Sequence, residues 1–191
     1  MQTIYFVTHP DVVIDPTVPV PNWPLSERGV QRMKQLLTKP WINEIQAIYC
    51  STEQKAIDGA QIVADHLSLP YQQHQALGEN DRAATGFLPK EDFERTADQF
   101  FANPDKSIRG WEPAGAAQQR IIKAIEAIIE KEDPDQNILI VSHGAVGALY
   151  LCHLKGCPIT RAEDQPATGG GNYYVWHPET GVLMHDWVLI D

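Results

Sequence analysis

The chain has 191 residues, of which 43% are hydrophobic and 21% are charged, and its formal net charge is −10. This length and composition predict one ordinary globular domain whose core is large enough to fold without disulfides. The negative charge argues against a broad nucleic-acid surface or an anionic-membrane surface, because both need a basic field. It is compatible with a small, locally positive pocket that binds an anion.

The three cysteines, Cys50, Cys152 and Cys157, are an odd number and are expected to be reduced thiols. No basic and apolar leader with a small-residue cleavage site is visible at the start of the chain. No apolar run approaches the length of a membrane span. We therefore expect a cytoplasmic protein with no membrane partner, and the sequence leaves its oligomeric state open.

The first part of the chain alternates predicted strands and helices. Residues 3–8 are short, apolar and β-branched, which is typical of a buried strand. The segment "LSERGVQRMKQLLT" predicts a helix with Ser26 as its N-cap. A second apolar strand, residues 45–50, is followed by a helix that Ser51 or Thr52 is expected to cap.

Residues 76–115 interrupt this alternation. They are rich in turn residues and contain one predicted helix, near residues 91–101. We interpret them as an inserted lid or lobe within a single domain that spans residues 1–191. A separate second domain is not needed to explain this segment.

The last part of the chain returns to alternating elements. The pattern predicts an amphipathic helix over residues 116–132, a fully buried strand "NILIVS" over 137–142 and a helix over 144–154. Two further strands, 172–176 and 183–189, flank the turn "HPETG". Strands that alternate with helices predict a layered α/β fold, and the last hairpin suggests an antiparallel edge on its sheet.

Two histidines end predicted strands at equivalent positions. His9 follows the first strand, and His143 follows the "NILIVS" strand and precedes Gly144 and a helix. Ligands of open α/β sheets gather beyond the carboxyl ends of the strands. Glycine lets a backbone approach a ligand closely, and a helix N-terminus favours an anion. If the two strands are neighbours, both imidazoles reach one crevice; the alternative is two unrelated capping or half-buried histidines.

Five segments, "YFVTHP", "PLSERG", "IYCSTEQKAIDGAQIVA", "LGEND" and "ILIVSHG", follow one another in the order and spacing of a known family. The sequence resembles the histidine phosphatase superfamily, in its phosphoglycerate-mutase-like branch. This resemblance implies a three-layer α/β sandwich, with a mixed, mostly parallel sheet and helices on both faces. It also implies a phosphohistidine intermediate, a small phosphate ester or other anion as ligand, no metal and no cofactor.

The resemblance implies roles for three catalytic residues. His9 matches the nucleophile, whose neutral imidazole nitrogen would attack phosphorus. His143 matches the second histidine, which would donate to the phosphoryl oxygens. Glu79 matches the acid that would protonate the leaving oxygen and later activate water. Without the resemblance, Glu79 would be interpreted as an exposed loop glutamate.

The candidate phosphate-binding residues are Lys55, Thr8, Gly144, Asn172 and Arg82. Lys55 matches a pocket arginine and keeps its charge without the bidentate geometry. Asn172 follows three glycines and is equally compatible with an ordinary turn residue. Arg82 is the nearest candidate to supply a missing cation; Lys90 and Arg109 lie in the same segment, and all three could instead be solvated surface charges.

The sequence departs from the family at three motifs. The Arg-His-Gly triplet is Thr8-His9-Pro10, the pocket arginine is Lys55, and the Gly-Glu-Ser before the long helix is Gly115-Ala116-Ala117. A threonine hydroxyl offers a phosphate one neutral hydrogen bond, whereas an arginine offers a charged fork. The sequence therefore predicts a degenerate active site.

Three functions follow from these residues. The first is a phosphatase-like hydrolase of small phosphorylated molecules, working through His9 with reduced activity. The second is a catalytically weak or inactive member of the family that binds a phosphate ligand or regulates another protein. The third is a different hydrolase or isomerase built from the same histidine pair and Glu79. Mutase activity is less expected, because no residues that would retain a bisphosphate are recognisable.

Overall fold

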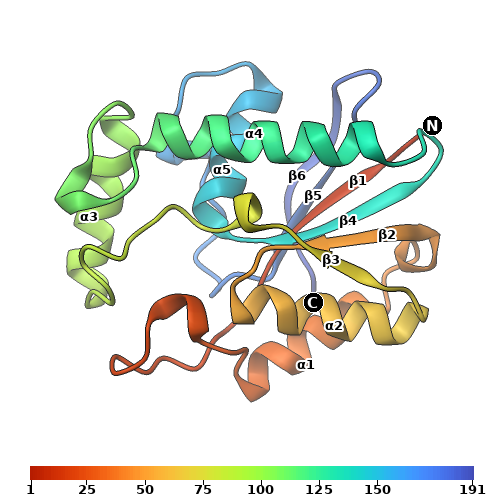
Figure 1. Cartoon of the computed structure of the whole chain (residues 1–191), viewed down its shortest axis with the longest axis horizontal. Coiled ribbons are helices and arrows are strands. Elements are labelled where there is room, and N and C mark those ends of the chain that lie inside the picture. The colour runs from red at the N-terminus through yellow and green to blue at the C-terminus, as the bar shows by residue number, and fades with distance from the viewer.

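The computed structural model describes all 191 residues and contains one six-stranded sheet (Figure 1). The strand order is β3-β2-β4-β1-β5-β6. Strands β1 to β4 run parallel to one another, whereas β5 is antiparallel to β1 and β6 is antiparallel to β5. The strands are β1 Ile4–Thr8, β2 Ile45–Cys50, β3 Tyr71–Gln73, β4 Asn137–Ser142, β5 Asn172–His177 and β6 Val182–Leu189. The mixed, mostly parallel sheet and its antiparallel edge are confirmed.

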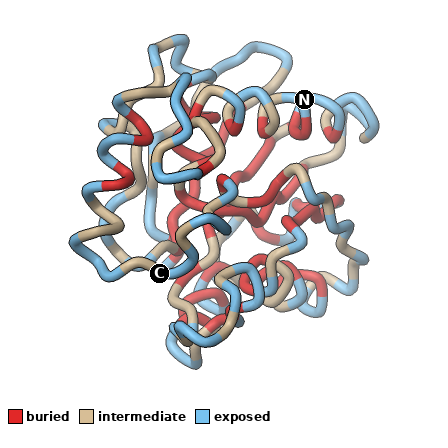
Figure 2. The backbone as a smooth tube through the Cα atoms, turned by 60° about the vertical axis from the view of Figure 1, so that its left-hand side comes forward, coloured by how far each residue is buried: buried red, intermediate tan, exposed pale blue.

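The chain forms five α-helices, four of which cover the two faces of the sheet (Figure 1). The five are α1 Glu27–Leu36, α2 Gln54–Leu67, α3 Lys90–Ala102, α4 Ala114–Lys131 and α5 Gly144–Lys155. Helices α1 and α2 pack on one face and α4 and α5 on the other (Figure 1). Each face has its own apolar core, and the four inner strands of the sheet between them, β2, β4, β1 and β5, are almost continuously buried (Figure 2). The three-layer α/β fold is therefore confirmed.

Strand β3 is the one element of the sheet that the sequence did not predict. Its three residues are Tyr71, Gln72 and Gln73, and both glutamines are exposed. The strand forms by backbone pairing with β2 at the edge of the sheet. A short edge strand of this kind carries no alternating apolar pattern, so only the fold reveals it.

The two predicted helix caps have different outcomes. Ser26 caps α1, because its side-chain oxygen accepts the Gly29 N–H. The prediction that Ser51 or Thr52 caps α2 is wrong: the N-cap is Glu53, whose side chain makes no capping bond. Ser51 is instead hydrogen-bonded to His143, the histidine that follows β4.

Residues 76–115 lie beyond the carboxyl ends of the parallel strands and include α3 (Figure 1). Trp111 is buried in this segment, with its ring centroid 6.1 Å from that of Phe100 and 5.9 Å from that of Phe93. The predicted helix is confirmed and is one residue longer at each end. None of the helices has the length and apolar character needed to cross a membrane.

Candidate active site

The two strand-terminal histidines lie next to each other because β1 and β4 are neighbours. Thr8 pairs with Ser142 in the parallel ladder, and the His9 N–H continues it by donating to the Ser142 carbonyl at 3.1 Å. The centroids of the His9 and His143 rings are 5.1 Å apart, and the rings are tilted by 66°. The structure provides the strand pairing on which the expectation of a shared crevice depends, but of the two imidazoles only that of His9 lines a cavity.

His9 is held as one tautomer. Its Nδ1 lies 2.9 Å from the Pro10 carbonyl oxygen, which can only accept, so Nδ1 carries the proton and Nε2 carries the lone pair. Burial, His143 and Lys55 together lower the pKa of His9 to about 3. A neutral imidazole with a free Nε2 is the form that can act as a nucleophile.

His143 is completely buried at the N-terminus of α5. Its Nε2 is 2.6 Å from Ser51 Oγ and 3.5 Å from a carboxylate oxygen of Glu53. Its Nδ1 has no hydrogen-bond partner, although it is buried. Burial lowers the pKa of His143, against the opposing effect of Glu53 and Glu79. A buried polar nitrogen without a partner is rare in folded proteins, so His143 Nδ1 is an exception in this core.

Glu79 is not an exposed loop glutamate. Its carboxylate accepts the N–H groups of Ala145 at 3.0 Å and Val146 at 3.1 Å, in the first turn of α5, and lies 3.4 Å from Arg82. Burial raises the pKa of Glu79, but Arg82, His143 and these N–H groups outweigh burial and lower it. The Glu79 carboxylate thus occupies the N-terminal end of α5, where a helix favours a negative charge.

Lys55 is buried on α2, and its ammonium already has partners. Its Nζ is 2.6 Å from a Glu53 carboxylate oxygen and donates to the Val20 carbonyl at 2.8 Å. Burial raises the pKa of Glu53, but His143, Lys55 and the Glu79 N–H lower it to about 2 overall. The Lys55 charge is therefore neutralised inside the protein, by a residue that the sequence reasoning missed.

Thr8 and Asn172 lie in a second internal network. Thr8 Oγ1 donates to Gln165 Oε1 at 2.7 Å and accepts the Asn172 N–H at 3.0 Å. Asn172 Nδ2 donates to the same Gln165 oxygen at 3.0 Å. Thr8 and Asn172 are both fully buried. Thr8 and Asn172 are therefore hydrogen-bonded to each other and to Gln165. Gln165 was not predicted from the sequence, because no local pattern indicates its role.

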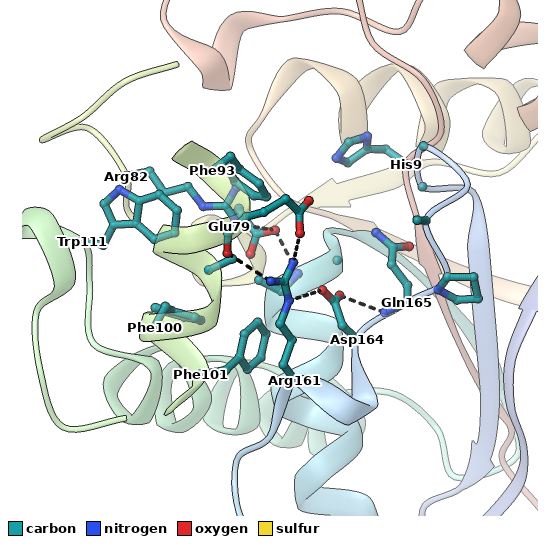
Figure 3. A pocket seen from close by; sticks show the side chains of 18 residues that line it. His9, Glu79, Arg82, Phe93, Phe100, Phe101, Trp111, Arg161, Asp164 and Gln165 are labelled. Atoms are coloured by element: carbon teal, nitrogen blue, oxygen red, sulfur yellow. Dashed lines mark hydrogen bonds and ion pairs between the residues drawn. The ribbon is translucent and has the colours of Figure 1, made fainter. Parts of the chain in front are cut away.

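A cavity of about 540 Å³ opens beside His9 (Figure 3). Of the residues predicted for the site, His9, Glu79, Arg82 and Gly144 line it. Four others, His143, Lys55, Thr8 and Asn172, lie behind this lining. The two other candidate cations, Lys90 and Arg109, are exposed and do not line it.

Residues 76–115 form one wall of the cavity. The Arg82 guanidinium carbon lies 4.9 Å from the ring centroids of both Phe93 and Trp111, a stacked arrangement that presents its edge to the cavity (Figure 3). Arg161 and Asp164 line the opposite side and form an ion pair at 3.7 Å. No group of three or more histidine, cysteine, aspartate or glutamate side chains is placed to hold a metal ion.

The glycine loop before β5 holds the backbone of His9, and this gives a prediction. Gly170 has φ +78°, and a Cβ there would lie 2.1 Å from the His9 carbonyl oxygen. Gly181, in the β5–β6 turn, has φ +66° with open space around it. Gly181→Ala is expected to cost about 1 kcal/mol of unfolding free energy, and Gly170→Ala at least about 2 kcal/mol more. Equal losses of unfolding free energy for the two variants, measured by urea unfolding, would show that Gly170 is not in close contact with the His9 backbone.

The pKa of His9 makes stability depend on pH. The unfolded-state histidine pKa is about 6.5, so between that pH and about 3 the unfolded chain binds a proton that the folded chain does not. Stability is therefore expected to fall as the pH drops below about 6.5, by up to about 1.4 kcal/mol per pH unit for this group. Urea unfolding from about pH 7 to about pH 5 measures how the free energy of unfolding depends on pH. His9→Asn is expected to make this dependence less steep. His66→Asn, on the exposed side of α2, is the control. A His9→Asn slope equal to that of the unchanged chain would contradict the lowered pKa.

Comparison with known sequences identifies the family. The family model of the histidine phosphatase superfamily (branch 1) matches residues 17–182, beginning after β1. One curated relative, 6-phosphofructo-2-kinase/fructose-2,6-bisphosphatase from Gallus gallus, is 25% identical over 133 residues. That match covers 68% of this chain and 27% of the relative, so the chain spans about a quarter of the relative's length.

Solved structures with this fold include several phosphatases. YhfR of Bacillus stearothermophilus superposes with a TM-score of 0.77 at 22% identity, covering 97% of this chain and 95% of that chain. The mycobacterial glucosyl-3-phosphoglycerate phosphatase in complex with inorganic phosphate gives 0.78 at 16% identity, covering 100% and 99%. The Entamoeba histolytica phosphoserine phosphatase in complex with 3-phosphoglyceric acid gives 0.78 at 15% identity, covering 98% of each chain.

At these identities the structural matches establish the fold, whereas the family match extends over most of the chain. The family match supports a phosphatase-type function. The chain belongs to the histidine phosphatase superfamily (branch 1).

Proposed function

We propose that the protein hydrolyses small phosphate monoesters through a phosphohistidine on His9. One observation carries the proposal: His9 lines the cavity as a neutral imidazole whose Nδ1 proton is held by the Pro10 carbonyl, leaving the Nε2 lone pair free. A nucleophilic histidine needs this form, with a neutral ring and an accessible lone pair. We propose a cytoplasmic location for this activity.

The proposed reaction has two steps. His9 Nε2 attacks phosphorus, the bond from phosphorus to the ester oxygen breaks, and the alcohol leaves with a proton. Water then attacks the phosphorus of the phosphohistidine, the bond from phosphorus to His9 Nε2 breaks, the water proton goes to a base, and inorganic phosphate leaves with neutral His9 restored. Glu79 is the proposed acid in the first step and the proposed base in the second. Because its pKa is lowered, Glu79 is better suited to the second step than to the first.

The groups proposed to stabilise the transferring phosphoryl group are few. Arg82 and Gly144 line the cavity, and the His143 ring, whose Nδ1 is unpaired, has its centroid 5.1 Å from that of His9. Thr8 and Lys55 are bonded to internal partners instead. Since losing one preorganised donor costs about 10²- to 10³-fold in rate, we propose that activity is reduced relative to a site with two free arginines.

We propose that residues 76–115 act as a lid on this site. They place Glu79, Arg82, Phe93 and Trp111 around the cavity and lie beyond the strand ends (Figure 1). A segment that supplies both the proposed acid and a cation would assemble the site when it closes over a ligand.

A second candidate function is a non-catalytic protein that binds an anion. The internal pairing of Lys55 with Glu53 and of Thr8 with Gln165 favours it, because both occupy positions that the family resemblance assigns to phosphate. The two functions separate in one experiment with the purified chain: release of inorganic phosphate from a panel of aryl and alkyl phosphates, beside calorimetric binding of inorganic phosphate. Turnover that His9→Ala abolishes supports hydrolysis. Binding without turnover on any ester supports the second function.

A further inference from the structure

Glu53 contacts three parts of the candidate site with one carboxylate. Its Oε2 lies 2.6 Å from Lys55 Nζ. Its Oε1 accepts the Glu79 N–H at 2.9 Å and lies 3.5 Å from His143 Nε2. The Glu53 side chain is only 13% exposed, and that of Lys55 5%. This carboxylate therefore occupies the interior of the site behind the cavity wall.

We propose that Glu53 is a built-in counter-anion, which competes with the phosphate of the ligand for Lys55 and so determines how tightly the site binds phosphate. The inference rests on the proposed function, because it concerns the same phosphate site. It assigns Glu53 a specificity-determining role, acting through Lys55 and not by contact with the reacting atoms.

The geometry supports competition over simple structural pairing. An ion pair that served the fold alone would need no link to the catalytic histidines, yet Glu53 is within 3.5 Å of His143 and bonded to the backbone of Glu79. Lys55 has a flexible stem and three donors, of which one contacts Glu53 and one the Val20 carbonyl. A phosphate that reached Lys55 would sit beside a fixed negative charge, and like charges within this range repel strongly in a buried site.

One consequence concerns inorganic phosphate, the product of the proposed reaction. Repulsion by Glu53 weakens binding of every phosphate, so a substrate must gain its affinity from the rest of the cavity. Inorganic phosphate has no such additional contacts and leaves easily. We therefore expect weak product inhibition in the unchanged chain and stronger product inhibition once the carboxylate is removed.

The test is calorimetric binding of inorganic phosphate to a two-by-two set of variants: the unchanged chain, Glu53→Gln, Lys55→Met and the double variant. Glutamine keeps the shape of Glu53 and an oxygen for the Glu79 N–H while it removes the charge. Glu53→Gln is expected to tighten phosphate binding at least about tenfold. In the Lys55→Met background the same change is expected to alter binding by less than about threefold, because the cation that Glu53 neutralises is gone.

Two controls keep the result interpretable. Asp65→Asn removes one negative charge from the exposed face of the same helix and is expected to leave phosphate affinity unchanged. If Glu53→Gln does not fold, Glu53→Asp is used instead: it retains the charge but shortens the reach to Lys55, and it is expected to tighten binding about threefold. The phosphate-dependent rise in melting temperature gives a second readout of the same affinities.

The proposal is overturned if Glu53→Gln or Glu53→Asp folds and binds phosphate no more tightly than the unchanged chain. It is also overturned if the gain persists in full without Lys55. These outcomes do not depend on turnover. If tighter binding is found while no ester is hydrolysed, the proposed hydrolysis fails and the role of Glu53 stands.

Discussion

Replacing His9 with alanine is expected to lower kcat for aryl phosphate hydrolysis by at least about 10³-fold, because the residue proposed to form the covalent intermediate is lost. The effect should fall on kcat more than on KM, since the proposed attack of His9 Nε2 on phosphorus is made in the transition state and not in substrate binding. Release of inorganic phosphate, measured over a range of substrate concentrations up to saturation, gives both constants. This loss would be the largest of any single substitution in the site.

The matched control is His66→Ala, which removes an exposed histidine from α2. It is expected to leave both constants unchanged within experimental error. His9→Ala must also retain a cooperative unfolding transition, so that loss of turnover is not loss of folding. A folded His9→Ala variant that hydrolyses the ester at the original rate would remove His9 from the mechanism.

Replacing Arg32 with methionine is expected to lower the free energy of unfolding by about 3 kcal/mol. Arg32 is buried on α1 and donates to Asp11 Oδ2 at 2.8 Å and to Asp191 Oδ1 at 2.9 Å. It also donates to the carbonyls of Thr168 and Gly170, in the glycine loop behind His9. Removing the guanidinium leaves these acceptors unpaired, and a buried partner left alone costs more than the pair contributed.

Arg28→Ala is the control for this prediction. Arg28 lies one helical turn before Arg32 and 3.5 Å from the other oxygen of Asp11, but its side chain is 75% exposed. Exposed ion pairs contribute little, so the loss is expected to stay below about 1 kcal/mol. Urea unfolding of both variants at neutral pH measures the difference. Similar losses of unfolding free energy in the two variants would mean that the hydrogen bonds of Arg32 do not stabilise the glycine loop before β5.

The fold could be predicted from the sequence because its strongest signals are local. The "NILIVS" run and the apolar first strand indicated buried strands, and Ser26 indicated the start of a helix. The placement of His9 beside His143 followed from one condition, that β1 and β4 are neighbours, which the register of Thr8 and Ser142 satisfies. Each of these inferences needed only chain order and periodicity.

The partners of the buried polar groups could not be predicted. Residues two apart do not face each other on a helix, so Glu53 and Lys55 gave no reason to expect an ion pair. They pair because Glu53 is the N-cap of α2, with extended backbone at φ −80° and ψ 139°, and so lies outside the helical geometry. Gln165 reaches Thr8 across 157 positions of sequence, and only the packed fold brings them together.

The same limit explains the wrong cap of α2. Ser51 is a good capping residue in isolation, because its short hydroxyl competes for backbone N–H groups. In the folded chain its oxygen is 2.6 Å from His143 Nε2, and the helix begins three residues later. Ser51 therefore bonds the buried His143 and does not cap the helix. This contact joins residues 92 positions apart, so the local sequence could not reveal it.

Phosphorylation of His9 Nε2 during turnover, which the proposed function requires, can be measured by rapid quenching under alkaline conditions followed by peptide mass analysis. We expect one phosphoryl group on the peptide that contains His9, formed before phosphate release and absent from His9→Ala. Turnover of an aryl phosphate with no phosphorylated His9 at any quench time, from a method that detects a phosphohistidine standard, would exclude the phosphohistidine on His9.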